Sequence, residues 1–379
     1  MHILILGGYG NFGGILSRLL STTTDIRLTI AGRSKEKALN FIQMNLQHAT
    51  IPVNSTVIDV HDPKLSALLA AIAPDLVIHT SGPFQGQDFH VAKSCIHAGI
   101  HYIDLADARS FVEDFHQLDA QAKEKDVLAI TGASTLPALS SAVIQHFLPH
   151  FQALEEIEYS ISSGNQTDRG EATVRAILSY TGKPFQRLVN GKMQSVIGWQ
   201  NLHKTTFAKP LGSRWLANCD IPDLALFPES YPNLKTQRFY AGLELSILHL
   251  GLWALSWLVR VGLISNLARF TKPIIWLSKQ FLKCGSQNGG MLMILSGKDH
   301  HNQPLTMRWD LVALENHGPL IPTIPTLVLA QKIAQGHLPQ RGAMHAMNLM
   351  SLEDFTIAVQ AFNIKQSVLF NDLNAPTEV

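Results

Sequence analysis

The chain has few cysteines and little net charge. Its 379 residues include three cysteines, which are far apart and show no Cys-x-x-Cys spacing. This pattern suits a reducing compartment and argues against a disulfide framework or a zinc site. A formal net charge of +1 gives no overall reason to expect nucleic acid as a partner. Because no basic leader with a cleavage site precedes the first apolar segment, we expect a cytoplasmic protein.

Acidic residues are missing from one long stretch. Residues 245–298 contain no Asp or Glu, although they contain six Lys or Arg and three Trp. The segment from Leu245 to Val259 is uncharged, with apolar side chains on every face of the implied helix, but a membrane-spanning helix needs roughly 20 such residues. Two interpretations of the apolar, basic helical segment 241–283 stay open. It forms a substrate pocket or dimer interface, or it contacts an anionic membrane or a long-chain apolar substrate.

Glycines are concentrated near the N-terminus. The apolar run from His2 to Leu6 predicts a buried strand, and an apolar pattern with helical spacing begins at Ile15. Between them lies Gly8-Tyr9-Gly10-Asn11-Phe12-Gly13, a Gly-x-Gly-x-x-Gly fingerprint in the strand–turn–helix context that a dinucleotide site requires. The positive end of this helix is expected to face the phosphates. The residues assigned to the cofactor are Gly7, Gly8 and Gly10, with Tyr9 beside them, whose role is left open.

No acidic residue stands at positions 32–35, directly after the second predicted strand, Ile26 to Ala31. Many NAD-binding domains carry an Asp or Glu at this point, where it binds the ribose 2′-hydroxyl. Arg33, Ser34 and Lys35 stand here instead, and these side chains suit a 2′-phosphate. Ser34 is also placed to cap the next helix, and Arg33 is alternatively a solvated loop charge. The pattern favours NADP as the cofactor.

Strands and helices alternate through residues 1–133, which predicts a Rossmann-type, doubly wound parallel sheet and an α/β fold class. The carboxyl edge of such a sheet faces the cofactor, so the segment Ser81-Gly82-Pro83-Phe84 is expected beside the nicotinamide. Side chains at this edge are candidates for moving a proton or anchoring a substrate. The predicted catalytic residues are Tyr102, Asp104, Asp107 and Ser134, with His79 as a further proton donor.

The second half of the chain has a mixed pattern. Residues 134–339 are predicted to form a second α+β domain with a mixed sheet, which includes a hairpin that turns at Asn190-Gly191. The C-terminal helices, at about 340–379, are expected to return to the first domain. A last amphipathic helix is predicted from Ser351 to Ile364.

Five segments occur in an order that resembles one family. They are Gly7-Gly8-Tyr9-Gly10-Asn11-Phe12-Gly13, Ala31-Gly32-Arg33-Ser34, Ser81-Gly82-Pro83-Phe84, Ala98-Gly99-Ile100-His101-Tyr102-Ile103-Asp104-Leu105 and Gly132-Ala133-Ser134-Thr135-Leu136-Pro137. Together they resemble the saccharopine dehydrogenase-like (saccharopine reductase-like) NADP-binding proteins, most specifically over residues 1–140. The resemblance implies a Rossmann domain, an inserted α+β domain, often a dimer, and chemistry at a C–N bond. The chain has Ala106-Asp107 where the family often has Gly-Glu.

These observations lead to one main expectation and one alternative. We expect an NADP-dependent oxidoreductase that transfers a hydride to or from a C–N or carbonyl carbon of a small-molecule substrate, and that forms a homodimer. The alternative is a non-catalytic NADP-binding protein that docks on membranes through residues 241–283, or a peripheral membrane reductase that acts on a lipid-like substrate. Turnover of NADPH separates the two classes.

Overall fold

The computed structural model describes residues 1–371 and 377–378. The chain divides into two compact units. Unit 1 contains Met1–Ala142 and Leu320–Ala358, and unit 2 contains Val143–Pro319 and Val359–Val379. The sequence analysis placed the first boundary after residue 133 and the return of the chain at about residue 340.

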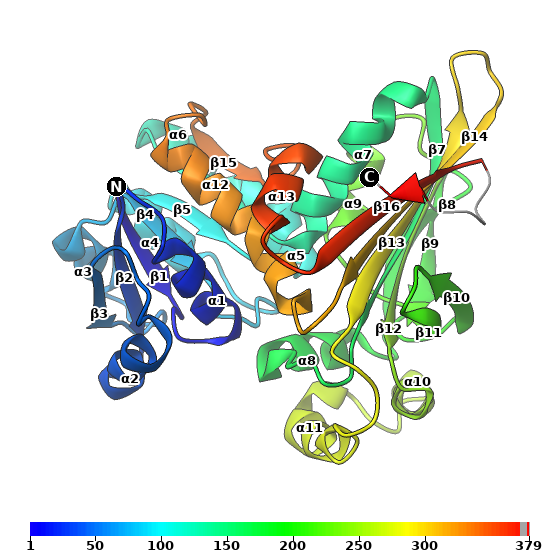
Figure 1. The fold of residues 1–379 in the computed structure, drawn as a ribbon, viewed down its shortest axis with the longest axis horizontal. Helices are drawn as coiled ribbons and strands as arrows, with labels where there is room; N and C mark the ends of the chain where they lie inside the picture. The colour runs from blue at the N-terminus through cyan, green and yellow to red at the C-terminus, as the bar shows by residue number, and fades with distance from the viewer. Residues whose placement is uncertain (372–376, 379) are drawn as a thin grey trace. The chain divides into compact units, whose positions relative to one another are not determined.

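Unit 1 is built on a seven-stranded parallel sheet with the order β15-β6-β5-β4-β1-β2-β3 (Figure 1). The strands are β1 (His2–Leu6), β2 (Arg27–Gly32), β3 (Val53–Val57), β4 (Leu76–His79), β5 (His101–Asp104), β6 (Leu128–Thr131) and β15 (Gly342–His345). Strands β1, β4 and β6 are buried along their whole length, and β5 is buried except at its first residue. This is expected of strands that are covered on both faces. The order changes direction between β1 and β4, which is the switch point where this architecture binds ligands. The predicted doubly wound sheet is confirmed.

Short helices connect these strands. They are α1 (Asn11–Leu20), α2 (Lys35–Asn45), α3 (Leu65–Ile72), α4 (His90–His97), α5 (Arg109–Glu113), η1 (Asp114–Leu118), α6 (Asp119–Glu124), the π-type turn η2 (Thr135–Leu139), α7 (Ser140–Phe147), η5 (Gly318–Thr323), α12 (Ile324–Ala334) and α13 (Leu352–Val359). Helix α12 comes from late in the chain and contacts α1 and β5. Its Thr326 hydroxyl donates to the Ala133 carbonyl at 2.6 Å. The returning chain therefore completes the core of unit 1.

The C-terminal segment differs from the expected run of helices. Residues 342–345 form strand β15, which pairs with β6, and the last helix ends at Val359 rather than at Ile364. Residues 364–370 form strand β16, which belongs to unit 2 and pairs there with β14. Both strands depend on partners remote in the sequence, and strand formation responds to such pairing more than to local preference. A local helical pattern therefore gave the wrong structure here.

Unit 2 contains a mixed eight-stranded sheet with the order β10-β11-β12-β7-β13-β14-β16-β17. Its strands are β7 (Ala153–Ser163), β10 (His203–Phe207), β11 (Gly212–Asn218), β12 (Thr236–Leu243), β13 (Gly289–Lys298), β14 (Pro304–Ala313), β16 (Ile364–Phe370) and β17 (Thr377–Glu378). Only β12 and β7 pair in parallel among the described strands of this sheet. Strands β8 (Pro184–Val189) and β9 (Lys192–Ile197) form a separate hairpin. Its turn has Asn190 at φ 52° and Gly191 at φ 74°, which confirms the predicted turn.

Helices η3 (Leu148–His150), α8 (Gly170–Tyr180), α9 (Asp223–Ser230), α10 (Ser246–Arg260), η4 (Leu267–Phe270) and α11 (Thr271–Lys279) complete unit 2. Helices α8, α10 and α11 gather at one end of its sheet (Figure 1). Leu178, Val259 and Leu267 form a small core between them. No helix among the described residues is both long and apolar enough to cross a membrane.

Candidate functional site

The glycine turn of unit 1 joins the ends of β1 and β2. The N–H groups of Gly7 and Gly8 both donate to the Ala31 carbonyl, at 2.8 and 3.2 Å, and the Gly10 N–H donates to the Gly7 carbonyl at 2.8 Å. A Cβ atom on Gly13 would overlap the Gly7 carbonyl, so only glycine allows α1 to pack this closely on the turn. Gly10 precedes α1 and has no side chain that could cap the helix. An anion at this helix N-terminus therefore meets no competing side-chain acceptor from the cap position. This cradle fits a dinucleotide pyrophosphate.

Tyr9 and Ser34 connect this turn to the start of α2. The Tyr9 ring lies so close to Gly32 that a Cβ on Gly32 would meet ring atoms within 2.6 Å. The Tyr9 hydroxyl accepts a hydrogen bond from the Ser34 N–H at 3.0 Å. The Ser34 hydroxyl accepts from the Lys37 N–H at 3.2 Å, so the predicted helix cap is confirmed. The side-chain contact of Tyr9 was not predicted, although a glycine at the end of β2 was a sign that something packs against it.

A chain of hydrogen bonds lies buried between β4 and β5. The Tyr102 hydroxyl donates to Asp104 Oδ2 at 3.0 Å and lies 3.1 Å from His79 Nδ1. The Tyr102 hydroxyl has one proton, and it donates that proton in the hydrogen bond to Asp104. The hydrogen bond between Tyr102 and His79 therefore needs a proton on His79 Nδ1. All three side chains are at most 1 % exposed. Burial lowers the pKa of His79 to about 3, so the ring is neutral.

Asp104 also holds the segments that follow β5 and β6. Its Oδ1 atom accepts from the Ala106 N–H at 2.9 Å, the Thr131 hydroxyl at 2.9 Å and the Gly132 N–H at 2.8 Å. Burial raises the pKa of Asp104 to about 6, while these hydrogen bonds and the one from Tyr102 act in the opposite direction. The structure therefore brings two predicted catalytic residues, Tyr102 and Asp104, together with His79 in one enclosed network.

Asp107 and Ser134 lie in the segments that this network fixes. Asp107 is exposed, and its Oδ1 accepts from Gln85 Nε2 at 3.2 Å. Surrounding protein atoms raise the pKa of its carboxyl, and the Gln85 hydrogen bond lowers it. Ser134 is 9 % exposed and follows Gly132, which Asp104 holds. Of the four predicted catalytic residues, Asp107 is the one that reaches solvent.

The segment after β4 is fixed separately. Gln87 Nε2 donates to the carbonyl oxygens of Ser81 and Pro83, at 2.9 and 2.7 Å. Phe84 is buried edge-on against the His79 ring, with 5.1 Å between ring centres. The Thr80 hydroxyl donates to the Leu6 carbonyl at 2.8 Å, beside the glycine turn. Sequence reasoning found this segment but missed Gln87 and Thr80, because neither belongs to a recognisable motif.

Residues 3–130 match the family model described as the saccharopine dehydrogenase NADP binding domain. This part of unit 1 is therefore similar to a saccharopine dehydrogenase NADP-binding domain. The match confirms the resemblance found in the sequence and confirms NADP as the cofactor of this oxidoreductase-type domain. No curated protein sequence matches the chain.

One solved structure shares its fold with nearly the whole chain. The apo saccharopine dehydrogenase (L-Glu forming) from Saccharomyces cerevisiae is 13 % identical, with 97 % of this chain and 99 % of that chain covered and a TM-score of 0.67. At this identity the likeness establishes the fold alone. Amine dehydrogenase from Mycobacterium smegmatis is 9 % identical, with 91 % and 94 % covered and a TM-score of 0.46. Biliverdin reductase from Synechocystis is 12 % identical, with 95 % and 96 % covered and a TM-score of 0.42.

Proposed function

We propose that the protein is an NADPH-dependent oxidoreductase that reduces or oxidises a C–N or carbonyl carbon of a small molecule. The observation that supports this most directly is the glycine cradle of an NADP-binding domain, with Arg33, Ser34 and Lys35 in place of an acid after β2. The dinucleotide supplies the hydride chemistry when it is bound. The residues of the chain bind it, orient it and control protons near the substrate.

A preference for NADPH over NADH follows from the donors near the start of α2. Arg33 is exposed and forms no ion pair among the residues that the structure describes, so its guanidinium is available to bind a phosphate through two parallel N–H groups. The hydroxyls of Tyr9 and Ser34 each accept a backbone hydrogen bond and keep a proton to donate. We assign these three side chains to a 2′-phosphate.

Titration calorimetry with NADPH and NADH tests this assignment. We expect wild-type protein to bind NADPH at least tenfold more tightly, a difference of about 1.4 kcal/mol, and Arg33→Ala to remove that difference. Lys64→Ala, which removes another exposed cation of unit 1, should leave it unchanged. Equal binding of both nucleotides by the wild type would contradict the role of Arg33. A protein that binds neither would contradict the oxidoreductase proposal itself.

The four predicted catalytic residues divide into two roles. We propose that Tyr102 and Asp104 are positioning residues, because they are fully buried and Asp104 fastens the segments after β5 and β6. Asp107 is proposed to contact the substrate, since its exposed carboxyl has a raised pKa and suits proton transfer to a substrate nitrogen. Ser134 is proposed to line the same edge as a hydrogen-bonding group.

NADPH oxidation in amine–aldehyde mixtures tests these roles. A mixture with L-glutamate as the amine is the first choice, because the yeast enzyme with the same fold is described as L-Glu forming. We expect Asp107→Asn to lower kcat at least tenfold with the Kd for NADPH unchanged. Asp114→Asn, an acid in η1, is the matched control and should keep full activity. Unchanged kcat in Asp107→Asn would remove that residue from the mechanism.

A second candidate property, attachment to an anionic membrane, is favoured by the outer face of α10. This helix buries only His249, Ser256 and Val259. Its apolar residues Ile247, Trp257 and Leu258 are 63 %, 41 % and 37 % exposed, and Val261, which directly follows the helix, is 62 % exposed. At 100° per residue these four positions fall within about 100° of arc, so they form one stripe that faces solvent. Because these side chains are exposed, packing within unit 2 does not explain why they are apolar.

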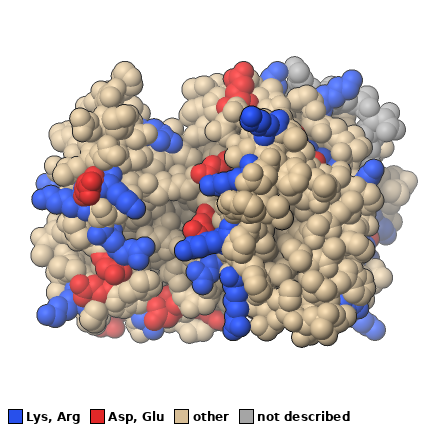
Figure 2. Space-filling view, turned by 90° about the horizontal axis from the view of Figure 1, so that it is seen from below, with Lys and Arg blue, Asp and Glu red and all other residues tan. Residues whose placement is uncertain are grey.

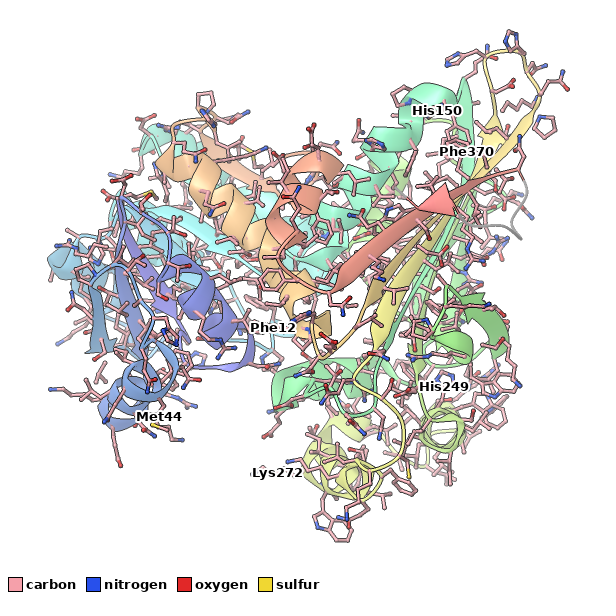
Figure 3. The ribbon with its side chains drawn as sticks, viewed as in Figure 1. Phe12, Met44, His150, His249, Lys272 and Phe370 are labelled. Carbon is pink, nitrogen blue, oxygen red and sulfur yellow. The ribbon has the colours of Figure 1, made fainter. Side chains whose placement is uncertain are left out.

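The neighbouring charges match this apolar stripe. Arg269, Lys272, Lys279 and Lys283 are exposed, and none of them forms an ion pair within the described part of the chain. Trp276 and Leu277 of α11 are 66 % and 54 % exposed beside them. Figure 2 views this side of unit 2 and shows a broad area without charge, with Lys and Arg along its border, and Figure 3 marks Lys272 on α11. Apolar side chains surrounded by unpaired cations suit the surface of an anionic bilayer.

Sedimentation with vesicles tests this property. We expect binding to phosphatidylcholine vesicles that contain phosphatidylserine, weaker binding at high salt, and a loss of at least tenfold in Val261→Asp. Met193→Asp, at an exposed apolar position of β9, is the matched control. If Val261→Asp instead converts a dimer to a monomer and vesicle binding is unchanged, the stripe is an interface between two copies and the membrane proposal is wrong.

A further inference from the structure

A cavity of about 430 Å³ lies in unit 2 between the β8–β9 hairpin, the end of β11 and α10. Its size is within the range of ligand pockets. It is separate from the glycine cradle and the buried network, both of which belong to unit 1. Its lining is mixed: one part is aromatic and apolar, one part consists of amide side chains, and two residues are cationic. The lining residues are Arg187, Val196, Ile197, Gln200, Asn201, Asn218, Trp253, Trp257 and Arg260.

Arg187 is a buried cation without a carboxylate. It is 8 % exposed, and its Nη1 donates to Asn218 Oδ1 at 2.9 Å. Its guanidinium carbon lies 5.7 Å from the centre of the Tyr240 ring, and its Nε atom has no hydrogen-bond partner. No described carboxylate forms an ion pair with it. Burying a charge without a counter-charge is costly, so a ligand that supplies one would be bound favourably.

Arg260 presents a second unpaired guanidinium to the same cavity. Its Nη1 donates to Gln200 Oε1 at 2.5 Å, and its guanidinium carbon lies 4.8 Å from the centre of the Trp257 ring. Both partners are neutral, and no acid lines the cavity. Trp253, Trp257 and Arg260 are four and three residues apart on α10, so they share one face of that helix. This places the second cation beside two indole rings.

We propose that this cavity binds an amphiphilic anion. Arg187 and Arg260 hold its phosphate or carboxylate group, and the two tryptophans contact its apolar part. Arginine suits such groups because its planar fork of N–H donors matches their oxygen atoms. The amides of Gln200 and Asn218 already hold the two guanidinium groups, which fixes the cations before the ligand arrives. The site does not depend on the proposed reductase activity.

Titration calorimetry with three probes tests the site on the full chain. Octyl phosphate carries both parts of the predicted ligand, inorganic phosphate carries the anion alone, and octanol carries the apolar part alone. We expect octyl phosphate to bind at least tenfold more tightly than either of the others, and Arg260→Gln to weaken it at least tenfold. Arg175→Gln, at an exposed arginine of α8 that does not line the cavity, should change the Kd for octyl phosphate less than twofold.

Two further measurements complete the test. Because Arg187 is buried, Arg187→Gln is used only if its thermal unfolding shows a folded protein. If Arg187→Gln does not fold, the test rests on Arg260→Gln, which changes an exposed side chain. NADPH binding should be the same in all variants, so a lost NADPH site is distinguishable from a lost anion site. Equal affinity for octyl phosphate and octanol, or an unchanged Kd in Arg260→Gln, would overturn the proposal.

Vesicles that contain phosphatidic acid separate two sources of the anion. If Arg260→Gln weakens vesicle binding as much as it weakens octyl phosphate binding, the ligand is a lipid headgroup. If vesicle binding does not change while octyl phosphate binding falls, the ligand is a free organic anion. Both results support the cavity as an anion site, and they differ only in where the anion comes from.

Discussion

Unit 1 and unit 2 each bury a charged side chain on a strand, and the two charges have different surroundings. Asp104 is fully buried and accepts four hydrogen bonds, from Tyr102, Ala106, Thr131 and Gly132. Arg187 is almost as buried, but its partners are neutral and its Nε has none. A buried charge with all its hydrogen bonds contributes to the fold, whereas one without them lowers stability, and the proposed anion would supply what Arg187 lacks.

Removing the satisfied charge should have the largest effect. Asp104→Ala leaves the N–H groups of Ala106 and Gly132 without their buried acceptor. We expect the free energy of unfolding to fall by about 4 kcal/mol, as for other buried networks that lose one partner. Urea denaturation measures this change. A loss below about 1 kcal/mol would show that water replaces the carboxylate and that the network does not hold the edge.

The pH dependence of stability should show the same network. The pKa of Asp104 is raised from 3.8 to about 6, so the folded state holds this proton more tightly, and the free energy of unfolding should fall as pH rises from about 4 to 6. The pKa of His79 is lowered from 6.5 to about 3, so its contribution should rise over pH 3 to 6.5. Asp104→Asn removes only the first effect. Across pH 4 to 6 we expect this variant to gain ~3 kcal/mol relative to the wild type, measured by urea denaturation; parallel profiles would contradict the assignment.

Tyr9 is an intermediate case between Asp104 and Arg187, because its hydroxyl accepts one hydrogen bond and still has one proton to donate. Tyr9→Phe removes the acceptor of the Ser34 N–H at a partly buried position. We expect a loss of about 1 kcal/mol in the free energy of unfolding, and NADPH binding weakened severalfold with NADH binding little changed. Thermal unfolding and calorimetry measure the two effects. If both nucleotides weaken equally, Tyr9 shapes the turn and does not contact the 2′-phosphate.

Replacing the unsatisfied charge should have the smallest effect on stability. Arg187→Met exchanges a buried cation for an apolar side chain of similar length, a change that is often neutral or stabilising. We expect the free energy of unfolding to stay within about 1 kcal/mol of the wild type or to rise, while octyl phosphate binding is lost. A large loss of stability would make Arg187 a second structural centre and would remove the contrast with Asp104.

The strands of unit 1 could be predicted from the sequence because most of them are short apolar runs with turn residues between them. The candidate edge was also predicted, since carboxyl ends of parallel strands meet at one side of the sheet. The contacts among His79, Tyr102 and Asp104 could not be predicted, because they depend on the register that places His79 beside Asp104. The start of α7 at Ser140 was not predictable either, because the π-type turn Thr135–Leu139, in which Leu136 is extended, precedes it.

Unit 2 was less predictable because its features depend on residues remote in the sequence. Arg187 lies on a hairpin strand and Arg260 at the end of α10, and no spacing rule connects them. Strand β16 forms because β14 offers it an edge, which a local pattern does not show. The segment 241–283 was predicted to be helical, and it contains α10, η4 and α11, but residues 241–243 belong to strand β12 instead. Which of its apolar residues are buried depended on the three-dimensional packing with α8.

The hydrogen bonds of Asp104 have a mechanical consequence. One carboxylate fastens both Ala106 and Gly132, so the segment that carries Asp107 and the segment that carries Ser134 move as one piece. The segment from Ser81 to Phe84 is fastened by Gln87, and Gln85, which directly follows it, connects it to Asp107 by a hydrogen bond of 3.2 Å. A substrate that displaces Asp107 is therefore expected to displace Ser134 as well, and the hydrogen bond from Gln85 passes that displacement on to the segment after β4.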